Sequence, residues 1–178
     1  MPTVYQRVLR DRFELLHPTL RRLLGDERGG RAAGRLRVTR PTGWLRRLAG
    51  AALGLPPAGE YDILLVVTPH GDGQLWVRHF GKHILSTSQS DHRGLLVESA
   101  GPGSLGFDLV IEREGLFFRP RRAWILGVPV PLWLSPYVEA DNVPSESGGW
   151  RITVRFRLPL LGPVGEYEGD VMIKEDVP

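Results

Sequence analysis

Residues 73–101 read GQLWVRHFGKHILSTSQSDHRGLLVESAG. Three segments with the composition of strands are separated here by two short polar turns, at residues 81–82 and 90–94. Short strands joined by tight turns are typical of an antiparallel meander, because consecutive strands usually lie side by side. This stretch therefore predicts a fold organised around consecutive antiparallel strands.

The same rhythm continues to the C-terminus. Alternating apolar and polar residues predict strands at 105–111 and 151–158, and the second returns as a hairpin to 165–173. Residues 63–67 read ILLVV, which is apolar on both faces and predicts a central strand covered on both sides. Pro120 predicts a bulge or an edge. We expect eight or more strands in a strongly curved sheet or a barrel, since closure removes exposed edges.

The upstream residues predict a helical cover. Residues 3–16 have the spacing of an amphipathic helix, residues 20–24 begin a second one, and residues 35–40 alternate as a first strand. A helix at 44–55 places Trp44, Leu45 and Leu48 on an apolar side that suits packing on a sheet. Its paired Arg46 and Arg47 allow a membrane-surface helix as the alternative, which we favour less.

These elements predict an α+β fold that is mainly antiparallel β, with two or three N-terminal helices packed on the sheet. We expect one domain over residues 1–178. Residues 1–58 would supply the helical cover and the first strand, and residues 59–178 the antiparallel meander.

Composition excludes several classes of function. The 178 residues contain no Cys, which excludes disulfides, thiolate metal sites and a Cys nucleophile. No apolar run approaches the roughly 18 residues of a membrane span, and the N-terminus lacks the apolar segment of a signal peptide. We therefore expect a cytoplasmic protein without a transmembrane segment.

Charge is distributed unevenly along the chain. Residues 1–58 hold 12 Arg and 4 acidic residues, a balance of +8, whereas residues 59–178 hold 11 basic and 16 acidic residues, a balance of −5. A basic segment can bind nucleic acid. Here the arginines are spread out and have no patterned aromatic residues beside them, so we expect no nucleic-acid partner.

Motifs for metal, nucleotide and nucleophilic chemistry are missing from the sequence. The five His residues lack metal-ligand spacing, no Ser lies in a nucleophile elbow, and no glycine-rich stretch matches a phosphate-binding loop. We expect no metal site and no cofactor.

The most informative polar residues are Arg78 and Glu98. Arg78 shares a strand face with Trp76 and Phe80, which is apolar by composition, and a buried charge needs a partner. Glu98, two strands later, is the candidate partner. We favour a structural ion pair; the alternative is a ligand anchor or a general acid–base group, with His79 as a further catalytic candidate.

Aromatic residues supply candidate walls for a ligand pocket: Trp76, Phe80, Trp124 and Trp133. Together with Arg78 and Glu98 they form the predicted ligand-binding set. The proline-rich apolar segment 127–136 is either the lid or mouth of such a pocket or a rigid connector packed on the core.

Several segments resemble an uncharacterised bacterial family, DUF4166. They are YQRVLRDRFELLHPTLRR (5–22), LGLPPAG (53–59), LWVRHFGKHILST (75–87), LLVESAGP (95–102), REGLFFRPRRAWILGVPVPLWLSP (113–136) and FRLPLLGPVGEYEGDV (156–171). Members of that family often follow a nicotinamide-dependent oxidoreductase domain similar to saccharopine dehydrogenase. The resemblance implies a stand-alone version that acts alone or beside a separately encoded oxidoreductase.

Three hypotheses for function remain open at this level. The first is a module that binds a hydrophobic or amphipathic small molecule inside the sheet or barrel. The second is a cofactor-independent acid–base enzyme, isomerase- or cyclase-like, on the same scaffold. The third is an interaction module for an oxidoreductase partner. An enclosed cavity favours the first two hypotheses, and a filled core with an exposed apolar patch favours the third.

Overall fold

The computed structural model describes residues 1–174, so the last four residues of the predicted domain lie outside the described part. Three short α helices, two 3₁₀ helices and eleven strands make up these residues. The helical elements are α1 (Val4–Leu9), η1 (Arg10–Leu15), α2 (Pro18–Gly25), α3 (Trp44–Ala52) and η2 (Leu132–Leu134). The strands are β1 (Gly30–Thr39), β2 (Gly59–His70), β3 (Gly73–Phe80), β4 (His83–His92), β5 (Leu95–Ala100), β6 (Gly103–Glu112), β7 (Gly115–Ile125), β8 (Val128–Val130), β9 (Tyr137–Pro144), β10 (Trp150–Leu158) and β11 (Gly162–Ile173).

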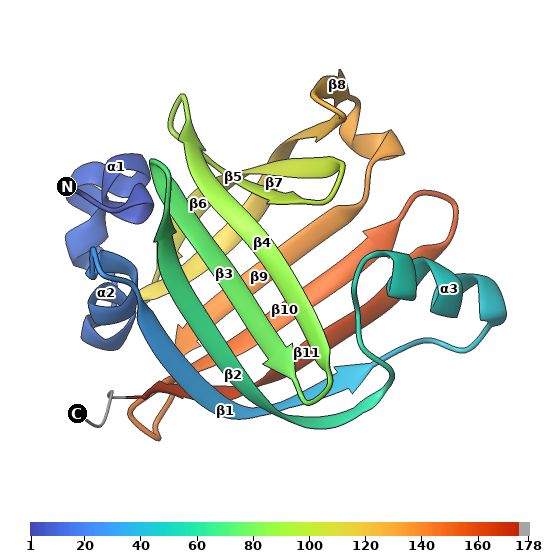
Figure 1. Cartoon of the computed structure of the whole chain (residues 1–178), viewed down its shortest axis with the longest axis horizontal. Helices are drawn as coiled ribbons and strands as arrows, with labels where there is room; N and C mark the ends of the chain where they lie inside the picture. The colour runs from blue at the N-terminus through green and yellow to red at the C-terminus, as the bar shows by residue number, and fades with distance from the viewer. Residues whose placement is uncertain (175–178) are drawn as a thin grey trace.

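The sheet closes on itself. Its strand order is β6-β5-β4-β3-β2-β1-β11-β10-β9-β7, and β7 returns to pair with β6. Ten antiparallel strands therefore form a closed barrel, and β8 extends one end of β7 as a short flap (Figure 1). The predicted curved sheet or barrel is confirmed in its closed form, and the predicted meander accounts for β2 to β7.

Alternation along each strand separates the inside of the barrel from its outer surface. In β3, Gln74, Trp76, Arg78 and Phe80 face the interior, whereas Leu75, Val77 and His79 lie on the outer surface and are half-buried. The same alternation corrects one prediction. Residues 63–67 are not covered on both sides, because Leu64 and Val66 lie on the outer surface of the barrel.

The N-terminal helices close one end of the barrel, at the left of Figure 1. Thr3 and Gln6 form a capping box that starts α1, and the Thr3 hydroxyl also donates to the carbonyl of Leu24 in α2. The predicted single helix over 3–16 is wrong in its second half. Arg10 has a φ of 51°, and the chain continues as the 3₁₀ helix η1.

The third helix lies at the opposite end of the barrel, at the right of Figure 1. Only its last turn meets the barrel interior, through Ala52 and the following Leu53. The predicted packing of its apolar side is wrong for the first half of the helix, because Trp44 and Leu48 are 72% and 63% exposed.

Two local features of the sheet depend on particular residues. A register shift between β6 and β7 falls beside Pro120, which confirms the predicted bulge. In β1, the backbone of β11 lies so close to Gly34 that an added Cβ would stand 2.0 Å from the carbonyl oxygen of Asp170. Only glycine permits this approach.

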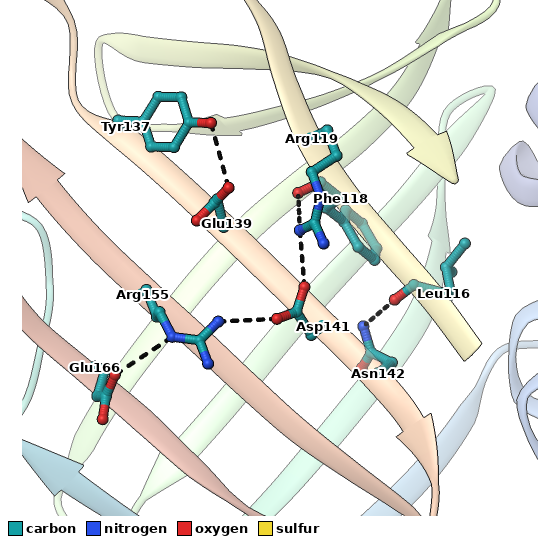
Figure 2. A network of polar contacts seen from close by, with 9 residues as sticks. All are labelled: Leu116, Phe118, Arg119, Tyr137, Glu139, Asp141, Asn142, Arg155 and Glu166. Atoms are coloured by element: carbon teal, nitrogen blue, oxygen red, sulfur yellow. Dashed lines mark hydrogen bonds and ion pairs between the residues drawn. The ribbon is translucent and has the colours of Figure 1, made fainter. Parts of the chain in front are cut away.

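A polar network on the outer surface strengthens the seam where β9 joins β7. This pairing is short, covering Leu116–Phe118 of β7. Beside it, Asp141 of β9 accepts hydrogen bonds from Arg119 of β7 at 2.8 Å and from Arg155 of β10 at 2.9 Å (Figure 2). One carboxylate therefore links three strands.

We expect Asp141→Ala to lower the free energy of unfolding by about 1–2 kcal/mol, because it removes two charge-assisted hydrogen bonds from a carboxylate that is only 18% exposed. Urea unfolding measures this loss. The matched control is Asp62→Ala, whose carboxylate is 85% exposed and pairs with Arg35, and which should cost less than about 0.5 kcal/mol. Equal losses in the two variants would contradict a special role for the seam.

Candidate functional site

A cavity of about 340 Å³ occupies the half of the barrel interior nearest α3. We call it the upper cavity. Its walls come from most of the strands and from the end of α3, and they are predominantly apolar. The lining includes Leu53, Leu85, Ala100, Leu105, Phe107, Ala123, Trp124, Val138, Val154 and Phe156.

Three polar side chains lie at the base of the upper cavity. Arg78 of β3 donates to the Thr87 hydroxyl at 2.9 Å and to Oε1 of Glu98 at 3.1 Å. The Thr87 hydroxyl in turn donates to the same Glu98 oxygen at 2.5 Å. The Arg78 and Glu98 side chains are only 13% and 20% exposed. This cluster confirms the predicted Arg78–Glu98 ion pair.

Strand register brings these residues together. Thr87 pairs with Trp76 across β3 and β4, so it lies diagonally opposite Arg78. Glu98 pairs with Gln89 across β4 and β5, and the inward alternation of three neighbouring strands therefore aims all three polar side chains at one point. The Trp76 ring lies under the guanidinium of Arg78, and the distance from the ring centroid to Cζ of Arg78 is 5.4 Å.

Arg78 and Tyr167, at the base of the upper cavity, both have raised pKa values and stay protonated. Burial by itself lowers the pKa of Arg78, but Glu98, with Tyr167 and Tyr5, more than offsets this and leaves that pKa above its ordinary value. Burial also raises the pKa of Tyr167, and Glu98 adds to the rise while Arg78 opposes it. Neither group gives up its proton at neutral pH.

A second, smaller cavity of about 50 Å³ lies below this cluster, toward α1 and α2. Arg78 and Tyr167 line both cavities and so separate them. Tyr5 of α1 closes the lower one and donates to Oε1 of Gln89 at 2.7 Å. Burial first, and Glu98 second, raise the pKa of Tyr5 well above its ordinary value, against weaker effects of Arg78 and Gln89.

The structure distributes the predicted site residues over several places. Arg78, Glu98 and Trp124 line the upper cavity, whereas Trp76 lines the lower one. Phe80 is fully buried against Tyr61 and Tyr167 and lines neither cavity. His79 follows Arg78 on the strand and therefore lies on the outer surface, away from the cluster.

The remaining predicted wall, Trp133, is exposed in η2 at the barrel end that carries α3. Its segment, 127–136, was predicted to be either a pocket mouth or a rigid connector. Ser135 and Pro136 line the upper cavity, so the segment borders the pocket.

Sequence reasoning missed Thr87, Tyr167 and Tyr5 as members of the site. Thr87 had a detectable signal, because it shares the inward register of β4 with Leu85 and Gln89. Tyr167 lies in the predicted return strand of the C-terminal hairpin, where alternation alone does not separate a cavity wall from the core. Tyr5 gave no signal in the sequence, because its place under the barrel depends on how the helices dock.

Residues 1–174 contain no group of three or more His, Asp or Glu side chains placed to hold a metal ion. Within the same residues, every helix is too short or too polar to cross a membrane.

Comparison with known proteins identifies the family. The model of DUF4166, a domain of unknown function, matches residues 16–171. The chain belongs to the DUF4166 family. A search of the curated proteins finds no match for this DUF4166 protein. A solved structure of a protein of unknown function from the DUF3598 family of Nostoc punctiforme is similar, with 12% identity and a TM-score of 0.46. The similarity covers 82% of this chain and 47% of that one, so this chain spans about half the length of that protein.

The Arg78–Glu98 pair makes a prediction about stability. Either Arg78→Met or Glu98→Leu leaves an unpaired charge inside the barrel and should lower the free energy of unfolding by about 3 kcal/mol. The double variant removes both charges, so its loss should be well below the sum, with a coupling energy of about 2 kcal/mol. Urea unfolding of the four proteins tests this. Additive losses would show that the two charges do not interact.

The buried tyrosines predict a fall in stability at alkaline pH. Their pKa values are raised in the folded protein, whereas in the unfolded chain they ionise near pH 10. Below about pH 10 both states hold the protons; above it the unfolded state loses them first, so the free energy of unfolding declines as pH rises. Tyr5→Phe should make this decline shallower by up to about 1.4 kcal/mol per pH unit. An unchanged slope in unfolding experiments at a series of pH values would be inconsistent with a buried, neutral Tyr5.

Proposed function

We propose that this protein binds an uncharged amphipathic small molecule in the upper cavity, with its apolar body against the walls and its polar group at the base. The observation that carries the proposal is an apolar cavity of about 340 Å³ whose base holds the Arg78–Thr87–Glu98 cluster. This volume lies within the range of about 300–1,000 Å³ of small-molecule sites.

The chemistry of the base favours an uncharged polar group. Arg78 is already neutralised by Glu98, so a carboxylate or phosphate entering the cavity would find no free positive charge to offset its desolvation. Both hydrogen bonds that Glu98 accepts from described residues go to Oε1. Its Oε2 atom thus provides an acceptor for a hydroxyl or an amide N–H of the ligand.

The cavity also separates the competing hypotheses. An interaction module needs no hollow interior, so the upper cavity supports binding over docking as the role of the barrel interior. An acid–base enzyme needs a group with a pKa near neutrality. Arg78 and Tyr167 have pKa values displaced upward from already high ones, which favours retention of a ligand over proton abstraction.

Two probes of equal chain length test the proposal, 1-decanol and decanoate. Titration calorimetry should find 1-decanol binding at one site per chain and decanoate binding at least about tenfold more weakly, because only decanoate must bring a second negative charge beside Glu98. In Glu98→Gln the base becomes positive, so decanoate should gain affinity and the order of the two probes should reverse. If neither probe binds, or if decanoate binds more tightly to the natural protein, the proposed ligand class is wrong.

Variants of matched chemistry locate the binding. Ala123→Phe places a ring in the upper cavity and should abolish binding of 1-decanol. Ala33→Phe adds the same ring on the outer surface of β1 and should leave binding unchanged. Equal binding by the two variants would place the ligand outside the barrel.

A further inference from the structure

The end of the barrel that carries α3 differs from the other end in its surface chemistry. We define its rim as the connections between strands at this end, residues 40–58, 81–82, 101–102, 126–136 and 159–161. The chain reaches this end at five points because strands alternate in direction. At the right of Figure 1, α3, β8 and the β10–β11 turn lie around it, opposite α1 and α2.

Large apolar side chains are exposed on three of these five connections. They include two tryptophans and several leucines: Trp44, Leu45, Leu48, Leu126, Trp133 and Leu160. None of them is needed to fill the core, and exposed groups of this size mark an interaction surface. Because they stand on separate tips around the opening of the upper cavity, they suit a flat, deformable surface better than a single rigid groove.

The charges of the rim have one sign. Its connections carry Arg40, Arg46, Arg47 and Lys82 and contain no Asp or Glu. The first acidic residues after α3, Glu60 and Asp62, are paired with Arg37 and Arg35. At the closed end, by contrast, the connections mix both signs, with Asp26, Glu27, Asp72, Glu114 and Glu146 among their arginines. The rim therefore complements a negatively charged surface.

We infer that the rim docks on the surface of an anionic lipid bilayer, with α3 lying in the interface. Trp is favoured at the boundary between headgroups and acyl chains, and an interfacial helix needs apolar residues beside basic ones, as α3 has in Trp44-Leu45-Arg46-Arg47-Leu48. Separate apolar tips insert between lipids while the cations contact phosphate groups. This docking needs no ligand in the cavity, so it stands independently of the proposed function.

Vesicle co-sedimentation tests the inference. The protein should sediment with vesicles of phosphatidylglycerol and phosphatidylcholine in equal parts, and much less with phosphatidylcholine alone or at high salt. Leu48→Ser should weaken binding to the anionic vesicles about tenfold. Leu15→Ser is the matched control, because Leu15 is 61% exposed, like Leu48, but lies at the closed end; it should bind as the natural protein does.

A pair of charge variants tests the electrostatic part. Arg46→Glu with Arg47→Glu should lower binding to the anionic vesicles by more than about tenfold. Arg93→Glu with Arg113→Glu changes the charge equally at two exposed turns of the closed end and should have little effect. Circular dichroism checks that every variant is folded.

Three results would overturn the inference. The first is absence of sedimentation with anionic vesicles. The second is equal loss of binding in the variants of the two ends. The third is a stable dimer in solution that Leu48→Ser dissociates, which would assign the rim to a second copy of this chain.

Discussion

Closure of the sheet is the constraint on which the other features depend. Because β7 pairs with β6 on one side and with β9 on the other, no strand edge remains in the ten-stranded ring. Each strand then has one face toward an enclosed interior and one toward the surface, which explains why Leu64 and Val66 lie outside. The seam carries few backbone pairs, and the carboxylate of Asp141 offsets this weakness from outside the barrel.

Because the interior is enclosed, the Arg78–Glu98 ion pair is buried, and buried ion pairs carry a desolvation cost. An apolar filling at this position would satisfy packing at no electrostatic cost, and a buried ion pair is weak evidence for stability. The geometry offers another role, because Arg78 lies between the two cavities and, with Glu98, gives the upper cavity a polar base beneath apolar walls. A site with this division distinguishes one end of a bound molecule from the other.

Sequence patterns predicted the parts of this fold that depend on local alternation. The strands, the bulge at Pro120 and the inward face shared by Trp76, Arg78 and Phe80 all follow from residues within one or two strands. The Arg78–Glu98 contact was also predictable, since it spans only β3 to β5. The break of the first helix at Arg10, the exposure of Trp44 and the place of Tyr5 were not, because they depend on how segments far apart in the chain dock. A predicted pocket wall such as Phe80 also lies correctly inward, yet packing against Tyr61 and Tyr167 leaves it no free surface.

The plug formed by α1 and α2 has a kinetic consequence. Tyr5 donates to Gln89 at the end of the barrel where α1 and α2 lie, and the upper cavity lies at the other end, beside α3. With α1 and α2 at the far end, a ligand bound as proposed would leave by the end beside α3 before another enters. Exchange of the proposed ligand would then be first-order, with a rate that does not rise with the concentration of the competitor. The end of α3 and the end of segment 126–136 line the upper cavity, so the proposed ligand would leave past these two segments.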